Sequence, residues 1–62
     1  MPVIIVEMFE GRTPEQKEQL VQLLTEGCIK ALTVPSEAVQ VVLHDVPRSN
    51  WGIAGVIQTP KK

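Results

Sequence analysis

The sequence predicts an α/β fold: a single βαβ subunit with parallel strands, followed by a C-terminal hairpin or arm. Two stretches rich in β-branched residues, 3–9 and 39–46, flank a stretch of helical periodicity at 13–32. A strand, a helix and a strand joined in this order form a right-handed unit with parallel strands. The 62 residues suffice for one domain, residues 1–62, without a linker or an internal repeat.

The first predicted strand, residues 3–9, is apolar on both sides of an extended chain. Val3, Ile5 and Phe9 fall on one side, and Ile4, Val6 and Met8 fall on the other. Strands of this kind are typical of parallel sheets that are covered on both faces. We therefore expect both faces of this strand to be covered.

A helix is expected from Thr13 to about Leu32. Thr13 is a suitable N-cap, Pro14 fits the first helical position, and Gln16 completes a capping box. Apolar residues then recur at spacings of three and four, which predicts a stripe facing the core: Leu20, Val21, Leu24, Cys28, Ile29 and Leu32. Pro35 ends this pattern, and residues 36–38 read as a short turn.

The second strand is predicted at 39–46, and a loop at 47–50 follows it. The glycines and small residues of 51–57 indicate a hairpin or an arm laid on a neighbouring chain, and we expect 59–62 to be a frayed tail. One helix and two strands leave a sheet face and strand edges uncovered, and other subunits are their natural cover.

Composition excludes several classes of function. Six Lys+Arg against seven Asp+Glu give a net charge of −1, so neither nucleic-acid binding nor adsorption to a membrane is expected. One cysteine and one histidine exclude a disulfide framework and a multi-cysteine zinc site, and no metal is expected. The short apolar run at the N-terminus suits neither a signal peptide nor a membrane span, so we expect a cytoplasmic protein.

Size also bears on assembly. The free energy gained by burying the apolar surface of a chain of this length only about equals the free-energy cost of the conformational entropy lost on folding. Because no disulfide or metal staple is expected, we expect the chain to gain stability by self-association.

One position carries recognisable chemistry. Pro2 directly follows Met1, and a strand begins at once. Removal of Met1 leaves Pro2 with a free secondary amine, and an α-amino group titrates at about 7.7–8.0 in model peptides. Burial against an aromatic ring or a nearby arginine disfavours the protonated amine and favours a general base. In the alternative interpretation, Pro2 merely begins an edge strand.

The sequence resembles the 4-oxalocrotonate tautomerase family over essentially its full length. The resemblance is carried by Met1-Pro2, Glu10-Gly11-Arg12-Thr13 with Glu15-Gln16-Lys17, Pro35, and Trp51-Gly52-Ile53-Ala54-Gly55. It implies an isomerase of the 2-hydroxymuconate type, whose N-terminal proline shuttles a proton in the enol–keto isomerisation of an unsaturated 2-oxo or 2-hydroxy acid. It also implies a homohexamer built as a trimer of dimers, a small carboxylate substrate, and no cofactor.

The resemblance assigns roles to particular residues. Pro2 matches the general base, and Arg12 matches an arginine that binds a substrate carboxylate. Trp51 lies where the family has an aromatic residue that keeps the site apolar. The family's sites commonly combine neighbouring chains, so Arg12, Arg48 and Trp51 are expected to serve a proline of another subunit.

One position departs from the family's pattern. The family's second arginine corresponds to Gln40, which donates hydrogen bonds but brings no charge. Arg48, on the loop before Trp51, is a candidate for supplying that charge, with a solvated loop arginine as the alternative. Asn50 is a further candidate for lining the pocket.

Two other functions remain open at this point. The same fold and proline resemble hydratase and dehalogenase branches that act on haloacrylates, for which Glu7, Glu10 and Asp45 are candidate water-activating carboxylates. A non-catalytic oligomeric module that binds a small acid is the third hypothesis, since Pro2 has no basicity while Met1 remains attached.

Overall fold

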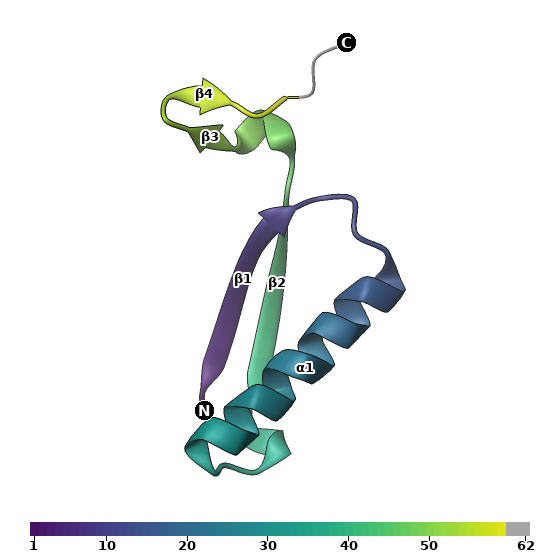
Figure 1. Ribbon diagram of the computed structural model, residues 1–62, viewed down its shortest axis with the longest axis vertical. Coiled ribbons are helices and arrows are strands. Elements are labelled where there is room, and N and C mark those ends of the chain that lie inside the picture. The colour runs from purple at the N-terminus through teal and green to yellow at the C-terminus, as the bar shows by residue number, and fades with distance from the viewer. Residues whose placement is uncertain (60–62) are drawn as a thin grey trace.

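The computed structural model describes residues 1–59 and has the predicted α/β architecture (Figure 1). The tail expected at 59–62 lies outside the described residues except for Thr59. In chain order the elements are strand β1 (Val3–Phe9), helix α1 (Pro14–Leu32), the 3₁₀ turn η1 (Ser36–Ala38), strand β2 (Gln40–Val46), the 3₁₀ turn η2 (Arg48–Asn50), strand β3 (Gly52–Ile53) and strand β4 (Val56–Ile57).

Strands β1 and β2 are parallel and pair over their whole lengths, from Val3 opposite Gln40 to Phe9 opposite Val46. The Gln40 N–H donates to the Pro2 carbonyl at 3.0 Å, and the Glu10 N–H donates to the Val46 carbonyl at 3.1 Å. These bonds extend the ladder by one residue beyond each end of β1. The N-terminus and the loop after β1 are therefore both anchored to β2.

The second strand begins one residue later than expected. The Val39 N–H donates to the Ser36 carbonyl at 3.1 Å and thereby closes η1. Val39 consequently belongs to the turn. Within η1, the pKa of Glu37 lies below its ordinary value, because its carboxylate accepts hydrogen bonds from its own backbone N–H and from the Ser36 hydroxyl.

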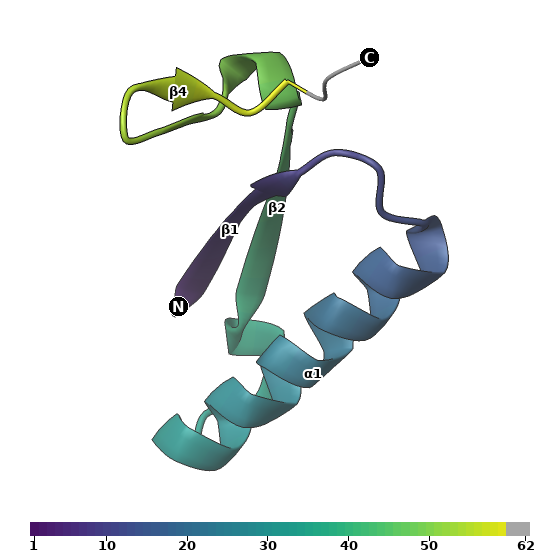
Figure 2. The same cartoon turned by 45° about the horizontal axis from the view of Figure 1, so that its top comes forward.

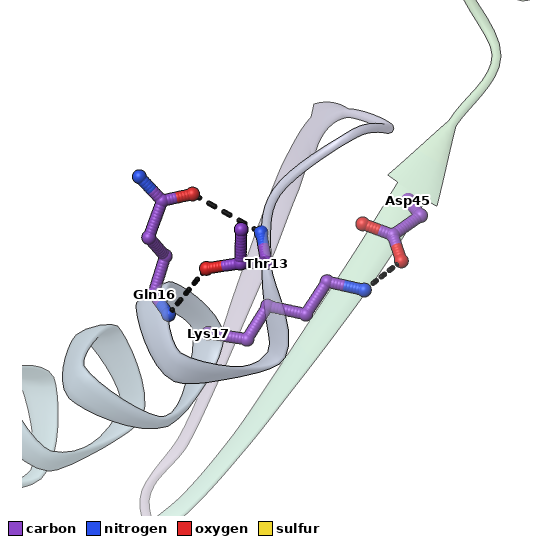
Figure 3. A network of polar contacts seen from close by, with 4 residues as sticks. All are labelled: Thr13, Gln16, Lys17 and Asp45. Carbon is purple, nitrogen blue, oxygen red and sulfur yellow. Dashed lines mark hydrogen bonds and ion pairs between the residues drawn. The ribbon is translucent and has the colours of Figure 1, made fainter.

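Helix α1 begins at the predicted capping box. The Gln16 N–H donates to Thr13 Oγ1 and the Thr13 N–H donates to Gln16 Oε1, both at 3.1 Å (Figure 3). The helix ends at Thr33, which has a left-handed φ of 57° and donates its N–H to the Ile29 carbonyl. Both ends of the helix are therefore fixed by local hydrogen bonds.

The helix covers one face of the β1–β2 sheet and leaves the other face open. Facing the helix are the half-buried residues Ile4, Val6, Met8, Val41 and Leu43. The open face carries Val3, Ile5 and Val42, whose side chains are 38%, 60% and 39% exposed. Both faces of the first strand were expected to be covered. Within a single chain, only the face that packs on α1 is covered.

Strands β3 and β4 form an antiparallel hairpin, which confirms the hairpin expected at 51–57. Ala54 and Gly55 form its turn with φ values of 52° and 81°, as in the two-residue turns that suit hairpin twist. The Gln58 N–H donates to the Trp51 carbonyl at 2.9 Å and closes the hairpin. The hairpin stands beyond the carboxyl ends of β1 and β2 (Figures 1 and 2).

A single chain is more open than a folded monomer of its mass. Its accessible surface is 4933 Å², whereas about 4,000 Å² is typical of a monomer of this size. Its radius of gyration is 14.7 Å, against about 10.6 Å for a compact domain of this length. No side chain among residues 1–59 is fully buried. One chain therefore lacks a closed core of its own.

The described part of the chain, residues 1–59, holds no helix with the length and apolar character needed to cross a membrane.

Candidate active site

Pro2 and Gln40 lie together at the amino end of the parallel strands. The bond from the Gln40 N–H to the Pro2 carbonyl fixes the backbone of Pro2, whose side chain is half-buried. Met1 is 78% exposed and makes the Pro2 nitrogen an amide. Its exposure leaves it accessible to a peptidase, and its removal converts that nitrogen into a secondary amine at a fixed position.

Arg12 lies at the other end of the strands, on the loop between β1 and α1. This loop is fixed before Arg12 by the Glu10–Val46 hydrogen bond and after it by the Thr13–Gln16 capping box. Gly11 has a φ of 112°, a conformation that side chains with a Cβ rarely adopt. The backbone thus holds Arg12 in place while its side chain remains exposed.

An ion pair ties the start of the helix to the end of β2. Lys17 Nζ contacts Asp45 Oδ2 across the space between the two elements (Figure 3). Both side chains remain partly exposed, so the pair adds little stability by itself. It links the first helical turn, which follows the Arg12 loop, to the carboxyl end of β2.

Trp51 and Arg48 meet at Phe9, the last residue of β1. The Arg48 guanidinium carbon lies over the Phe9 ring, 4.1 Å from its centroid. The Phe9 and Trp51 ring centroids are 4.6 Å apart, with an interplanar angle of 59°. We call these three residues, Phe9, Arg48 and Trp51, the aromatic cluster.

Turn η2, which follows the carboxyl end of β2, is closed by two backbone hydrogen bonds. The Asn50 N–H donates to the Pro47 carbonyl at 2.8 Å, and the Trp51 N–H donates to the Arg48 carbonyl at 3.1 Å. Asn50 is the last residue of this turn and is exposed. The structure thus brings Arg48, Asn50 and Trp51 together on one short segment.

Sequence reasoning missed Phe9 as a functional candidate. It is the only phenylalanine of the chain and immediately precedes Glu10-Gly11-Arg12. A large aromatic side chain at the carboxyl end of a parallel strand, next to a candidate binding loop, is the signal that was available. Its contacts with η2 could not be inferred without the tertiary structure.

The predicted site residues do not all meet within one chain. Pro2 and Phe9 are seven residues apart on an extended strand, a separation of about 23 Å at 3.3 Å per residue. Pro2 and Gln40 are therefore far from the aromatic cluster and from the Arg12 loop. Residues 1–59 of a single chain also enclose no detectable pocket.

The candidate water-activating carboxylates are mostly engaged elsewhere. His44 Nδ1 lies 2.9 Å from Glu7 Oε2 on the open face of the sheet, and Asp45 contacts Lys17. Over residues 1–59, no three His, Cys, Asp or Glu side chains gather closely enough to hold a metal ion.

Comparison with known proteins assigns the family. The family model described as "Tautomerase enzyme" matches residues 2–59. A 2-hydroxymuconate tautomerase of Comamonas testosteroni is 46% identical over 56 residues, which cover 90% of this chain and 89% of that protein. A second relative, a probable tautomerase of Ralstonia nicotianae, is 42% identical over 62 residues, covering 100% of this chain and 89% of that protein.

Solved structures agree with these matches. A 4-oxalocrotonate tautomerase isozyme of Methylibium petroleiphilum superposes with a TM-score of 0.88 at 42% identity, covering 92% of both chains. A heterohexamer 4-oxalocrotonate tautomerase of Chloroflexus aurantiacus superposes with a TM-score of 0.89 at 31% identity, covering 94% of both chains. The chain thus belongs to the 4-oxalocrotonate tautomerase family of the tautomerase superfamily and is an isomerase of the tautomerase type.

Proposed function

We propose that the protein is a cofactor-independent cytoplasmic tautomerase that interconverts the enol and keto forms of an unsaturated 2-hydroxy or 2-oxo acid, with Pro2 as the general base. The reaction type is that of the 2-hydroxymuconate tautomerases, because the Comamonas testosteroni relative bears that name. The uncharged Gln40 in place of the family's second arginine disfavours the dicarboxylate 2-hydroxymuconate itself. The observation that carries the proposal is the fixed position of Pro2, which follows an exposed Met1.

The proposed reaction moves one proton. After removal of Met1, the neutral Pro2 nitrogen takes the proton of the enol hydroxyl. The O–H electrons form the carbonyl, and the conjugated double bonds shift by one position. The protonated Pro2 nitrogen then returns the proton to carbon, which regenerates the neutral base. Arg12 binds the substrate carboxylate, and Trp51 excludes water from the reacting atoms.

The proposed site is completed between chains. Within one subunit, about 23 Å separates the end bearing Pro2 from the end bearing Arg12 and Trp51, a distance longer than a small unsaturated acid. An open sheet face and exposed apolar side chains favour self-association, which the heterohexameric relative from Chloroflexus aurantiacus also supports. We propose a homohexamer, a trimer of dimers, in which Arg12 and Trp51 of one chain serve Pro2 of another.

The remaining candidates have secondary roles in this proposal. The backbone N–H of Gln40 is hydrogen-bonded to the Pro2 carbonyl. The side-chain amide of Gln40 donates hydrogen bonds to the substrate near the reacting atoms. Arg48 supplies a second guanidinium at the end of the sheet that bears Arg12, and Asn50 lines the pocket from the same turn as Arg48.

Modification of Pro2 tests the proposal. The intact mass of the purified protein first establishes whether Met1 has been removed. Acetylation near neutral pH then targets the N-terminal amine, because lysine amines, with pKa values of about 10.4, stay protonated. The product is an amide without basicity, so we expect the modified enzyme to lose roughly 10²–10⁴-fold in kcat/KM. Enzyme carried through the same procedure without the reagent is the control.

A substrate panel separates the reaction types. Phenylenolpyruvate and 2-hydroxymuconate are assayed by absorbance, together with 3-haloacrylates. Turnover of the enols, without turnover of the haloacrylates, is the expected result. Isomerisation by protein that retains Met1, at the rate of Met1-free protein, would overturn the role of Pro2. Turnover of haloacrylates alone would favour the hydratase or dehalogenase reaction.

A further inference from the structure

The aromatic cluster joins two residues whose proposed roles differ. Arg48 lies over the Phe9 ring at 4.1 Å from its centroid, and Trp51 packs against the same ring at 4.6 Å. Phe9 and Trp51 are half-buried, whereas Arg48 remains exposed. One phenylalanine at the end of β1 therefore contacts both the proposed wall of the site and an exposed guanidinium.

This contact changes what Arg48 can do. An exposed arginine on a short turn samples many rotamers, and binding an anion would have to restrict them. The negative face of an aromatic ring attracts a guanidinium. A guanidinium that stacks on a ring keeps the N–H groups at its edge available for a carboxylate. Phe9 thus restricts Arg48 without using up its donors.

The distribution of charge points to the same end of the sheet. Lys17 is paired with Asp45. Arg12 and Arg48, by contrast, follow the carboxyl ends of β1 and β2 and form no ion pair within residues 1–59. At the opposite end, the polar side chain next to Pro2 is the uncharged Gln40.

We propose that Phe9 is a positioning residue that holds the Arg48 guanidinium as a second anion-binding group, at the same end of the sheet as Arg12. This inference rests on the proposed function and adds a substrate preference to it. The guanidiniums of Arg12 and Arg48 attract a substrate carboxylate to one end of the site. A second carboxylate, at the end that bears Pro2, would meet only the uncharged side-chain amide of Gln40. Unsaturated acids with a single carboxylate are therefore favoured over dicarboxylates.

Equilibrium binding tests the inference without requiring turnover. Crotonate, a monocarboxylate, and fumarate, a dicarboxylate, are titrated into the assembled protein. Binding is followed by fluorescence, since Trp51 is the only tryptophan. The variants are Phe9→Leu, which keeps an apolar side chain without a ring, and Phe9→Tyr, which keeps the ring. Arg48→Gln and the double variant Phe9→Leu/Arg48→Gln complete a cycle.

We expect Phe9→Leu to raise the Kd of crotonate by about three- to tenfold and Phe9→Tyr to leave it near the wild-type value. In the Arg48→Gln background, Phe9→Leu should have no further effect, because Phe9 acts through Arg48. Arg48→Lys should bind crotonate more weakly than wild type, because an ammonium lacks the planar guanidinium that stacks on the ring. Wild-type protein should bind crotonate at least as tightly as fumarate.

Several results would overturn the inference. One is an equal loss of crotonate affinity from Phe9→Leu in the wild-type and the Arg48→Gln backgrounds, and another is an equal loss from Phe9→Leu and Phe9→Tyr. Tighter binding of fumarate than of crotonate, or no saturable binding of crotonate to the wild-type protein, would also overturn it. The proposed function would fail by a different result: Met1-free protein would bind crotonate as expected but would not turn over the enols.

Discussion

Arg12 combines a fixed backbone with an exposed side chain. The Glu10–Val46 hydrogen bond precedes it, Gly11 bends the chain at a φ of 112°, and the capping box follows. A guanidinium held in this way can bind a carboxylate with little loss of backbone entropy. Pro2 is held by a similar device, a single backbone bond to Gln40. At the scale of single residues, the candidate base and the candidate carboxylate-binding arginine thus both lie on anchored backbone.

Replacement of Arg12 is the first test at this scale. Arg12→Ala should lower kcat/KM for a 2-hydroxy-dienoate by about tenfold to a hundredfold, because a hydrogen bond to a charged group contributes about 1.5–3 kcal/mol. The loss should fall mainly on KM. Steady-state kinetics check it, and Arg12→Lys, which keeps the charge, should retain part of the activity. Unchanged kinetics in Arg12→Ala would remove Arg12 from the site.

The helix shows how local signals position distant side chains. Its capping box fixes the first turn, from which Lys17 reaches Asp45 at the end of β2 (Figure 3). At its other end, the Ile29 carbonyl accepts a hydrogen bond from the N–H of a left-handed residue, Thr33, although a β-branched side chain is poorly suited to that conformation. The residues at the start of the helix therefore suit their backbone conformation well, whereas Thr33 at its end suits its conformation poorly.

The capping box supports one prediction about stability. Thr13→Ala should lower the free energy of unfolding by about 1 kcal/mol, because the Gln16 N–H loses its acceptor. Thr13→Ser, which keeps the hydroxyl, is the control and should stay near the wild-type value. Denaturant unfolding at one fixed protein concentration measures both. Equal stabilities of the two variants would mean that the cap contributes nothing.

The C-terminal end of the helix gives a prediction of the opposite sign. Thr33→Asn should raise the free energy of unfolding by about 1 kcal/mol, since asparagine adopts the left-handed conformation at lower cost. Thr33→Val keeps the β-branch and should bring no gain. Thermal unfolding at matched concentrations distinguishes the two, and a gain from Thr33→Val would refute this explanation.

At the scale of the whole molecule, the sheet links the proposed assembly to the proposed site. One face packs on α1, and the other exposes Val3, Ile5 and Val42. The two ends of that sheet carry different parts of the proposed site, with Pro2 at one end and the aromatic cluster at the other. Self-association can therefore cover the open face and complete the site together.

A charge placed on the open face tests this link. Ile5→Lys puts a lysine at a side chain that is 60% exposed in one chain and should reduce the assembled mass measured by light scattering, since burying an unpaired charge is costly. Enol turnover should fall with it. The matched control is Gln19→Lys on the exposed side of α1, which adds the same charge and should leave assembly intact. A dissociated variant with full activity would refute the shared site.

The sequence by itself determined the elements and most of their ends. The β-branched runs predicted β1 and β2, Thr13-Pro14 with Gln16 predicted the helix start, and the glycines of 51–57 allowed the hairpin. These features depend on short-range sterics and hydrogen bonds, which neighbouring residues specify. The helix stripe likewise predicted the half-buried side of α1, but it was wrong at Leu32, which is 57% exposed because it lies in the last turn of the helix. The family resemblance supplied the candidate base and arginine.

Only the tertiary structure decided which distant residues meet. Strand register brings Glu7 to His44, and turn η2 brings Arg48 and Trp51 onto Phe9. It also decided that Pro2 and the aromatic cluster lie at opposite ends of one sheet, and that one apolar face stays open. Such contacts join residues about forty positions apart, and they follow from how the strands pair and how the helix crosses them. No pattern among neighbouring residues predicts these long-range contacts.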